Sequence, residues 1–274
     1  MQTDTIQRQY DEVIAQHYDL DPQNVTGDSL DKAVEQLQST ENLKLAESAL
    51  RILDVGCGTG MFCERLRNEA GMSIDPYGLD LSQAMVDIAG ERISDMKLAV
   101  DDAANLDDHF QDVSFNIICT HFMTGFVPID VLAPKIHNKL DEGGYWSFVG
   151  GTMGGFPNLQ KKADLKILKM IFGGKSIDTP SLVSNPQDEA DVVQKLQSHG
   201  FEVCQSETFQ PEVNFANFDE FMDFAYRGGW LTPFVEKLGL HKLNRTSQAI
   251  LNKLAFPIKD HHSIVLALAR KQNQ

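Results

Sequence analysis

The 274-residue chain lacks the features that mark membrane, secreted and metal-binding proteins. Its longest apolar run near the C-terminus, residues 264–269, is far too short to cross a bilayer, and its polar first residues are not typical of a signal peptide. It has only four cysteines, none at metal-ligand spacing, a pattern that favours free thiols in a reducing compartment. We therefore predict a cytoplasmic protein with no bound metal and no membrane partner.

Positive charge is also scarce, with 24 lysines and arginines against 39 aspartates and glutamates and a formal net charge of −15. A polyanion such as DNA or RNA would meet a repulsive long-range field around such a protein. The one lysine cluster, at residues 161–175, is typical of the solvated face of an amphipathic helix. The composition therefore argues against a nucleic-acid partner, and it carries no information on the oligomeric state.

What the sequence does contain is a series of short apolar segments separated by helix-like stretches. Five segments are predicted as β-strands, at residues 51–55, 77–79, 97–100, 115–120 and 145–149. Ser82 is predicted to cap the helix that follows the second strand. Alternating strands and helices favour a parallel sheet covered on both faces, which is a doubly wound α/β domain. Residues 1–50, with helices expected at 6–18 and 30–49, are predicted to form an N-terminal helical cap.

The alternation stops after Gly150. The glycine-rich stretch 150–155 is predicted to be flexible. The elements expected after it are a helix at 159–172, a helix from Ser184 or Asn185 (before Pro186) to about His199, a strand opening at Phe201, two aromatic-rich helical stretches within 211–260, and a closing strand at 262–270. We interpret 151–186 and 210–260 as insertions folded over one mouth of the sheet, inside a single domain that spans 51–274.

A glycine loop, Asp54-Val-Gly-Cys-Gly-Thr-Gly60, directly follows the first strand. Glycines at such a position let the backbone turn sharply and let a ligand approach without meeting a Cβ atom. The dinucleotide pattern requires a sixth-position glycine where this chain has Met61, and no P-loop lysine follows. The loop therefore favours a ligand that joins an amino acid to a nucleoside without a pyrophosphate.

Polar residues end the next three strands. Asp80 follows the second strand, where a carboxylate accepts hydrogen bonds from ribose hydroxyls. Asp102 and Ala103 follow the third strand, where a carboxylate and a backbone N–H can hold an adenine ring. Thr120 and His121 end the fourth strand and are expected to face the same crevice.

These motifs, together with Asp80-Leu-Ser-Gln-Ala-Met85 and Asp102-Ala-Ala-Asn-Leu106, resemble the class I S-adenosylmethionine-dependent methyltransferases. The broad group that they resemble includes the ubiquinone/menaquinone C-methyltransferases, and the resemblance covers about residues 50–150. It implies a Rossmann-like seven-stranded sheet with the last strand antiparallel, S-adenosylmethionine as cofactor and S-adenosylhomocysteine as product. The cofactor-binding residues that it implies are Tyr18, Asp54, Gly56, Cys57, Gly58, Asp80, Leu81, Met85, Asp102, Ala103 and Thr120. The chain departs from the family's pattern at Asn116, where aspartate is usual, and at Glu142, where proline is often found.

The resemblance predicts methyl transfer to a small-molecule acceptor, held in a pocket formed by the two insertions. His121 is the candidate general base, because imidazole titrates near neutrality, and a hydrogen-bonded histidine that shapes the pocket is the alternative. Within the aromatic segment 215–234, Arg227 and Trp230 are the candidate acceptor-binding residues, with core packing as the alternative. The adjacent His261 and His262 point oppositely on an extended chain, which argues against a metal pair.

Other functions remain open at this point. A protein or nucleic-acid methyltransferase would carry the same cofactor motifs, and so would a non-catalytic protein that only binds S-adenosylmethionine. The choice among carbon, nitrogen and oxygen as the methylated atom depends on pocket shape, which the sequence does not reveal.

Overall fold

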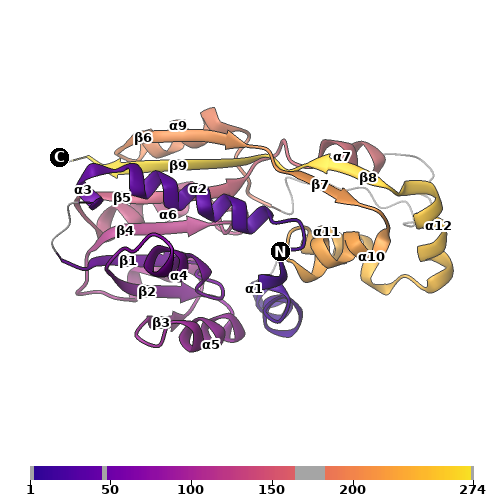
Figure 1. Ribbon diagram of the computed structural model, residues 1–274, viewed down its shortest axis with the longest axis horizontal. Helices are drawn as coiled ribbons and strands as arrows, with labels where there is room; N and C mark the ends of the chain where they lie inside the picture. The colour runs from indigo at the N-terminus through magenta and orange to yellow at the C-terminus, as the bar shows by residue number, and fades with distance from the viewer. Residues whose placement is uncertain (1–2, 45–47, 164–182, 273–274) are drawn as a thin grey trace.

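A computed structural model describes residues 3–44, 48–163 and 183–272 of the chain (Figure 1). Its centre is a seven-stranded sheet in the order β3-β2-β1-β4-β5-β9-β6. The strands are β1 (Leu50–Val55), β2 (Ile74–Asp80), β3 (Lys97–Val100), β4 (Phe115–His121), β5 (Leu140–Gly151), β6 (Phe201–Phe209) and β9 (Ile264–Lys271). Strands β1 to β5 pair in parallel, and β9 runs antiparallel to its neighbours β5 and β6. The predicted sheet, with its last strand antiparallel, is confirmed.

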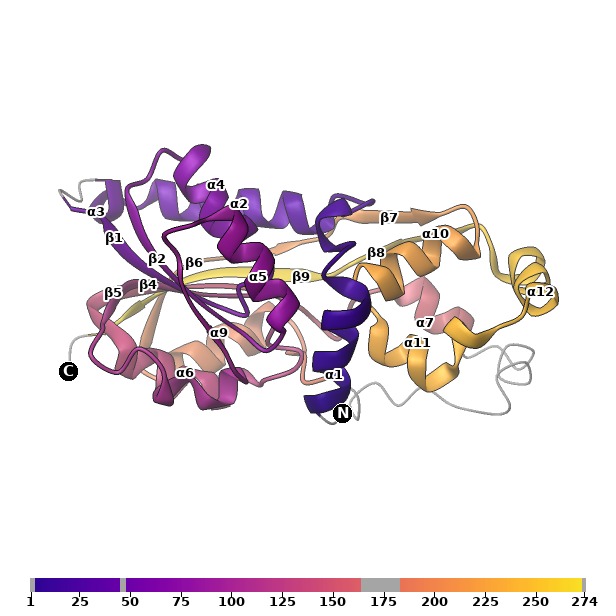
Figure 2. The ribbon, with the colours of Figure 1, turned by 90° about the horizontal axis from the view of Figure 1, so that it is seen from below.

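Helices cover both faces of this sheet (Figure 2). One face carries α2 (Val25–Ser39), α4 (Met61–Asn68) and α5 (Gln83–Arg92), and the other carries α6 (Ile129–Lys139) and α9 (Glu189–Ser198). Because the sheet is buried on both sides, its strands are nearly continuous apolar runs, and residues 264–269 of β9 are all fully buried. Trp146, Phe115 and Phe148 are the bulkiest side chains of the core between the sheet and α6.

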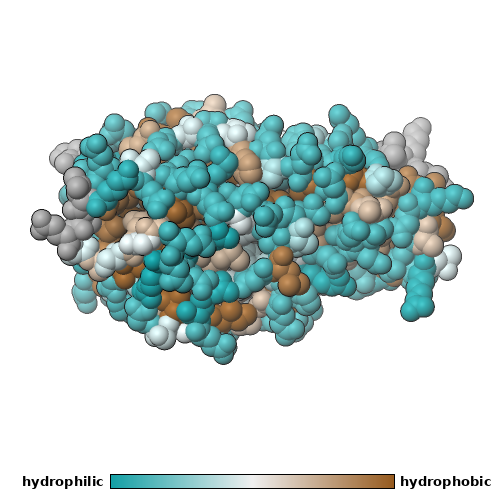
Figure 3. Space-filling view, viewed as in Figure 1, coloured by the Kyte–Doolittle hydropathy of each residue, from teal (hydrophilic) through white to brown (hydrophobic). Residues whose placement is uncertain are grey.

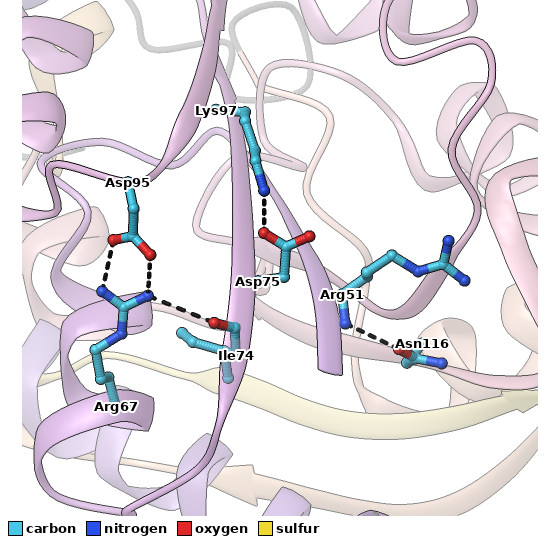
Figure 4. Close-up of polar contacts among 7 residues, drawn as sticks. All are labelled: Arg51, Arg67, Ile74, Asp75, Asp95, Lys97 and Asn116. Atoms are coloured by element: carbon cyan, nitrogen blue, oxygen red, sulfur yellow. Dashed lines mark hydrogen bonds and ion pairs between the residues drawn. The ribbon is translucent and has the colours of Figure 1, made fainter. Parts of the chain in front are cut away.

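Polar contacts fix the strands where the sheet begins (Figure 4). The side-chain oxygen of Asn116 accepts a hydrogen bond from the backbone N–H of Arg51 at 2.8 Å, which ties β4 to β1. Arg67 of α4 pairs with Asp95 at 2.7 and 2.9 Å and also reaches the carbonyl of Ile74. The asparagine that departs from the family's usual aspartate thus joins two strands at the edge opposite the glycine loop.

Helix boundaries follow local capping chemistry. The Ser82 hydroxyl accepts a hydrogen bond from the backbone N–H of Met85 at 3.2 Å, which confirms the predicted cap of α5. Helix α9 begins later than predicted, because Asp188 caps it by accepting from the N–H of Asp191 at 3.0 Å. Asn185, the predicted start, lines a cavity instead.

The N-terminal region is helical, as predicted, but more broken. Helix α1 (Thr3–Gln9) continues as a π-helical turn over Tyr10–Ile14, and α2 begins before the predicted position 30. The expected second helix ends at residue 39 and is followed by the short α3 (Glu41–Lys44). In Figure 2, α1 crosses the junction between the sheet and the lobe described next.

A lobe extends beyond the carboxyl ends of the parallel strands (Figure 1). Its elements are α7 (Pro157–Ala163), β7 (Glu212–Phe215), α10 (Phe218–Met222), α11 (Thr232–Leu238), α12 (Arg245–Ala255) and β8 (Ile258–His261). Strands β7 and β8 form an antiparallel pair that the sequence analysis did not predict, since it assigned only helices to 211–260. The N–H of His262 donates to the carbonyl of Pro211 at 3.0 Å, so the chain enters and leaves this pair at neighbouring points.

Residues 150–172 were predicted to form a flexible stretch followed by a helix. The helix expected at 159–172 is present as α7 up to residue 163, and its remainder lies outside the described residues. The stretch 150–155, predicted to be flexible, is packed: Gly150 and Gly151 belong to β5, and a Cβ at Gly155 would come within 2.5 Å of the His262 ring. Glycine is required there for close approach. Among the described residues, no helix has the length and apolar character needed to span a membrane.

Candidate functional site

A cavity of about 370 Å³ lies between the carboxyl edge of the sheet and the lobe. Ligand pockets commonly fall in this size range and occur at this edge of α/β sheets. The predicted site residues that line it are Tyr18, Gly56, Gly58, Asp80, Leu81, Met85, Asp102, Ala103, His121 and Trp230. We call the part bounded by the ends of β1, β2 and β3 the cofactor end, and the part bounded by the lobe the acceptor end.

The glycine loop forms the floor of the cofactor end. Gly56 and Gly58 adopt φ angles of +77° and +52°, which strain any residue that carries a Cβ atom. A Cβ at Gly56 would lie 2.9 Å from the Cβ of Met123, and one at Gly58 would lie 3.7 Å from the Tyr18 ring. The positive φ favours glycine at both positions, and at Gly56 the close approach of Met123 also leaves no room for a Cβ atom.

Asp80 joins the loop to the next helix. Its Oδ2 accepts a hydrogen bond from the N–H of Gly58 at 2.8 Å, and its Oδ1 accepts from the N–H of Ser82 at 2.9 Å. Desolvation raises the pKa of Asp80, while the N–H groups of Ser82 and Gly58 oppose that rise. Each carboxylate oxygen has two acceptor sites, so the oxygens that fix the loop can still accept from ligand hydroxyls.

Two more carboxylates stand at the same end. Asp102 accepts from the N–H of Ala104 at 2.9 Å, and this bond caps the turn after β3. Asp101 pairs with His109 at 2.8 Å, and that hydrogen bond lowers the pKa of Asp101. With Asp80, these acids give the cofactor end a negative potential that suits a cationic ligand.

The N-terminal segment closes this end. Asp11 Oδ1 accepts hydrogen bonds from the Ser82 hydroxyl at 2.6 Å and from the N–H of Ala84 at 3.1 Å. These bonds place Tyr10 and Tyr18 on the cavity wall, where burial raises the pKa of both phenols. Only Tyr18 was predicted to be a site residue. The contact joins Asp11 to Ser82, 71 positions away, so no local sequence pattern could predict it.

Three predicted cofactor-binding residues lie beneath the wall and not on it. Asp54 is 2% exposed, its Oδ1 has no hydrogen-bond partner among the described residues, and burial raises its pKa to about 8. Cys57 is also buried under the loop. The Thr120 hydroxyl accepts from the indole N–H of Trp146 at 2.8 Å and faces the core. The structure places these side chains as support for the loop and for β4.

His121 is enclosed at the middle of the cavity. Its Nε2 lies 3.0 Å from the Ser147 hydroxyl, and its ring meets Phe62 edge-on at 4.3 Å between centroids. Burial lowers the pKa of His121 to about 3, so the imidazole is neutral at physiological pH and a weak base. This environment fits the alternative prediction, a hydrogen-bonded histidine that shapes the pocket, better than it fits a general base.

Aromatic rings form the acceptor end. Trp230 contacts Phe122 at 4.9 Å and His262 at 5.2 Å, both roughly perpendicular, and Phe156 stacks on His262 at 4.4 Å. The other candidate from the same segment, Arg227, is not at the cavity: it pairs with Asp223 on the surface, where half of each side chain is exposed.

At the acceptor end the sequence analysis also missed His262, because it was considered only as a metal ligand. A usable signal was nevertheless present in the predicted topology. An antiparallel strand begins at the edge where its parallel neighbours end, so the residue just before β9 must lie at the mouth of the sheet.

Comparison with known families bears on the same region. Residues 52–144, which run from β1 to the start of β5, match the family described as a methyltransferase domain. The chain carries a methyltransferase domain. A search of curated proteins found no match.

Solved structures extend the likeness of this methyltransferase over most of the chain. A Bacillus halodurans protein described as a candidate methyltransferase gives a TM-score of 0.58 at 16% identity, over 89% of this chain and 99% of that one. The YcgJ protein of Bacillus subtilis gives 0.57 at 15% identity, over 90% and 100%. The magnesium protoporphyrin IX methyltransferase of Synechocystis, solved with bound S-adenosylhomocysteine, gives 0.51 at 15% identity, over 89% and 83%. At these identities the likeness is one of fold.

The cofactor end fits S-adenosylmethionine, the cofactor of this enzyme class. Glycines leave space at the loop, Asp80 and Asp102 offer carboxylate oxygens, and the acids suit the positive charge of a sulfonium. The family match at residues 52–144 and the geometry of the cofactor end together point to S-adenosylmethionine as the cofactor and S-adenosylhomocysteine as the product.

Proposed function

We propose that this enzyme methylates a small-molecule acceptor bound between β4, α1 and the lobe. The observation that carries the proposal is the continuity of the cavity, which runs from Asp80 and Gly58 through His121 to Trp230 and His262. A cofactor held at one end and an acceptor held at the other would meet inside one continuous space.

The proposed roles of the cofactor end follow from its geometry. Asp80 holds the ribose hydroxyls, Asp102 and the N–H of Ala103 hold the adenine, and Gly56 and Gly58 admit the methionine portion. Leu81 and Met85 pack against the nucleoside, and Tyr18 covers the loop. Asp54, Cys57 and Thr120 act indirectly, by fixing the loop and β4 from below.

The proposed methyl transfer needs little acid–base catalysis from the protein. S-adenosylmethionine supplies a methyl group on a positively charged sulfur, an electrophile ready for in-line attack. The chain contributes by orienting the acceptor and excluding water, effects that can supply roughly 7–11 kcal/mol of the barrier. His121, neutral and bonded to Ser147, shapes the passage between the two ends.

Enclosure and charge favour a small acceptor over a macromolecule. The cavity is walled by the N-terminal segment on one side and by the lobe on the other. The outer face seen in Figure 3 is mostly hydrophilic, and the net charge of −15 opposes nucleic acid. The four free cysteines support a reducing, cytoplasmic setting for the reaction.

The motifs that resemble the ubiquinone/menaquinone C-methyltransferases lie at the cofactor end, between residues 54 and 106. They support the choice of cofactor. The acceptor, and with it the choice among carbon, nitrogen and oxygen, belongs to the lobe, which those motifs do not reach.

The cofactor assignment is tested by calorimetric titration with S-adenosylhomocysteine. We expect wild-type protein to bind it, and Asp80→Ala to bind at least about tenfold more weakly, because charge-assisted hydrogen bonds contribute about 1.5–3 kcal/mol. Asp95→Ala, which removes an exposed carboxylate paired with Arg67, is the control and should leave affinity unchanged. No binding to wild type would remove the proposal.

The acceptor class is tested with S-adenosylmethionine labelled on its methyl group. We expect label to enter low-molecular-mass compounds when the enzyme is given a fractionated metabolite extract. Label found only in the protein or nucleic-acid fraction of the same extract would favour the macromolecular alternative instead. The Asp80→Ala variant, which is expected to bind the cofactor more weakly, is the negative control for both fractions.

A further inference from the structure

The acceptor end contains a polar pair that no role described so far uses. The imidazole of His262 makes no hydrogen bond to any described residue, although the side chain is only 5% exposed. The amide of Asn185 likewise has no hydrogen-bond partner among the described residues and lines the same cavity. Buried polar groups are normally satisfied. The fully buried atom without a partner is His262 Nδ1, whereas Nε2 and the partly exposed Asn185 amide lie at the cavity wall, where a ligand can supply a partner.

The two side chains converge on one point of the wall. A Cβ at Gly151 would lie 2.9 Å from His262 Nε2 and 3.7 Å from Asn185 Nδ2, so both nitrogens lie close to this glycine and to each other. His262 is held there by Phe156, which stacks on it, and by Trp230, which meets it edge-on. A rigid ring with a fixed polar edge is typical of a recognition element.

The rest of the acceptor end is mostly apolar, and its one charged lining residue within the described chain is Lys162. The charged residues that line the whole cavity, within the described chain, are Asp80, Asp101, Asp102 and Lys162. The acids belong to the cofactor end, and the Lys162 ammonium donates to the carbonyls of Ala255 and Pro257. Burial also lowers the pKa of His262 to about 3, which keeps its imidazole neutral. A phosphate or carboxylate placed here would be buried without a partner, at a high cost in free energy.

We propose that His262 and Asn185 bind the hydroxyl group of an uncharged, ring-containing acceptor whose flat face lies among Trp230, Phe122 and Phe156. A hydroxyl can donate to His262 Nε2 and accept from the Asn185 amide at the same time, and the surrounding rings suit an aromatic or unsaturated ring system. This inference rests on the proposed function. It makes His262 a residue that binds the acceptor and leaves cofactor binding to the other end.

The test uses three probes on protein saturated with S-adenosylhomocysteine: 2-naphthol, naphthalene and 2-naphthyl phosphate. Ligand fluorescence or ligand-observed NMR gives each dissociation constant. We expect 2-naphthol to bind at least about tenfold more tightly than the other two, since naphthalene lacks the hydroxyl and the phosphate carries a charge. Equal binding of 2-naphthol and 2-naphthyl phosphate by wild type overturns the inference.

Variants then assign the effect to His262. His262→Phe should reduce 2-naphthol affinity to that of naphthalene, and His262→Gln, which keeps a polar atom in reach, should restore part of the difference. His199→Phe is the matched control, because that histidine lies on the surface and pairs with Asp130. Unchanged discrimination in His262→Phe contradicts the assignment.

A glycine pair keeps the test usable if His262→Phe fails to fold. A Cβ at Gly155 would displace the His262 ring, at 2.5 Å from Nδ1, whereas a Cβ at the adjacent Gly154 would have no contact closer than 3.5 Å. Gly155→Ala should weaken 2-naphthol binding at least about threefold, and Gly154→Ala should not. Every variant is also titrated with S-adenosylhomocysteine: loss of 2-naphthol binding with cofactor binding intact separates failure of this inference from failure of the proposed function.

Discussion

The two ends of the cavity are lined by different kinds of residue. The cofactor end has glycines in left-handed conformations and the carboxylates of Asp80, Asp101 and Asp102, most of them bonded to backbone N–H groups. The acceptor end has stacked and perpendicular rings and a histidine kept neutral by burial. The cofactor end holds its charged groups in fixed hydrogen bonds, and the acceptor end is lined mainly by aromatic rings, with a few polar groups among them.

The difference matches what each end must do. A cationic cofactor is the same in every turnover, so a rigid negative site can be tied into the turns that follow β1, β2 and β3. The acceptor end must exclude water and position a neutral molecule, which apolar surface accomplishes without charges that would need partners. Substitutions at one end should therefore leave the other end's binding intact.

The largest expected effect is at the glycine loop. Gly58→Val places a branched side chain at a φ of +52° beside Tyr18 and should weaken S-adenosylhomocysteine binding at least about thirtyfold, or ~2 kcal/mol. Gly71→Val is the control, because Gly71 has a φ of +65° with no atom within 4 Å of its Cβ position. Calorimetry together with thermal unfolding separates lost affinity from backbone strain. Equal affinity losses in the two variants would contradict the role of the loop.

The next effect is at the opposite end. Trp230→Ala removes the ring that contacts Phe122 and His262 and should lower acceptor turnover about tenfold while cofactor affinity stays within about twofold. Turnover of labelled metabolite extract and calorimetry measure the two quantities. Trp230→Phe should retain most of the activity. A parallel fall in both quantities would show that the two ends are not independent.

A smaller effect is expected on stability and its dependence on pH. The pKa of Asp54 is raised to about 8 in the folded protein from an ordinary value near 4, so the folded state holds the proton more tightly. The resulting stabilisation is complete below about pH 4 and is lost as the pH rises to about 8. Asp54→Asn cannot ionise, so its melting temperature should gain at least about 4 °C relative to wild type between pH 5 and pH 8. A constant difference across that range would contradict the raised pKa.

The smallest effect concerns the closure of the cofactor end. Asp11→Ala removes the acceptor of the Ser82 hydroxyl and Ala84 N–H bonds and should weaken S-adenosylhomocysteine binding about threefold to tenfold. The neighbouring Glu12 is exposed, so Glu12→Ala serves as its control. Stopped-flow measurement should place the change in the dissociation rate. An unchanged rate would mean that the N-terminal segment does not retain the cofactor.

The same contrast explains what the sequence could predict. The cofactor end follows from short motifs, because Gly58, Asp80 and Asp102 each stand directly after a strand whose place in the sheet is set by its apolar pattern. The acceptor end depends on residues far apart, such as Phe122, Trp230 and His262, which meet only through tertiary packing. Strands β7 and β8 pair residues about 45 positions apart, for example Val213 with Asp260, so neither looks like part of a hairpin locally.

Burial explains the remaining differences. Asp54 and Thr120 stand beside residues of the wall, yet alternation along β1 and β4 turns their side chains inward. Arg227 shares a short segment with Trp230 but reaches the surface, where it pairs with Asp223. The spacing of the motifs in the sequence located the candidate site. The direction of each side chain decides which of the predicted residues line the cavity.

The contact between the backbones of Pro211 and His262 closes the part of the lobe formed by residues 211–262: the chain leaves the sheet after β6 and returns at β9 at a neighbouring point. This segment is therefore one continuous insertion between two neighbouring strands of the sheet. We expect a chimaera that receives the corresponding segment of another enzyme of this fold to keep its cofactor and to adopt the donor's acceptor preference, so diversification in this architecture can proceed by exchange of one cassette while the catalytic platform stays constant.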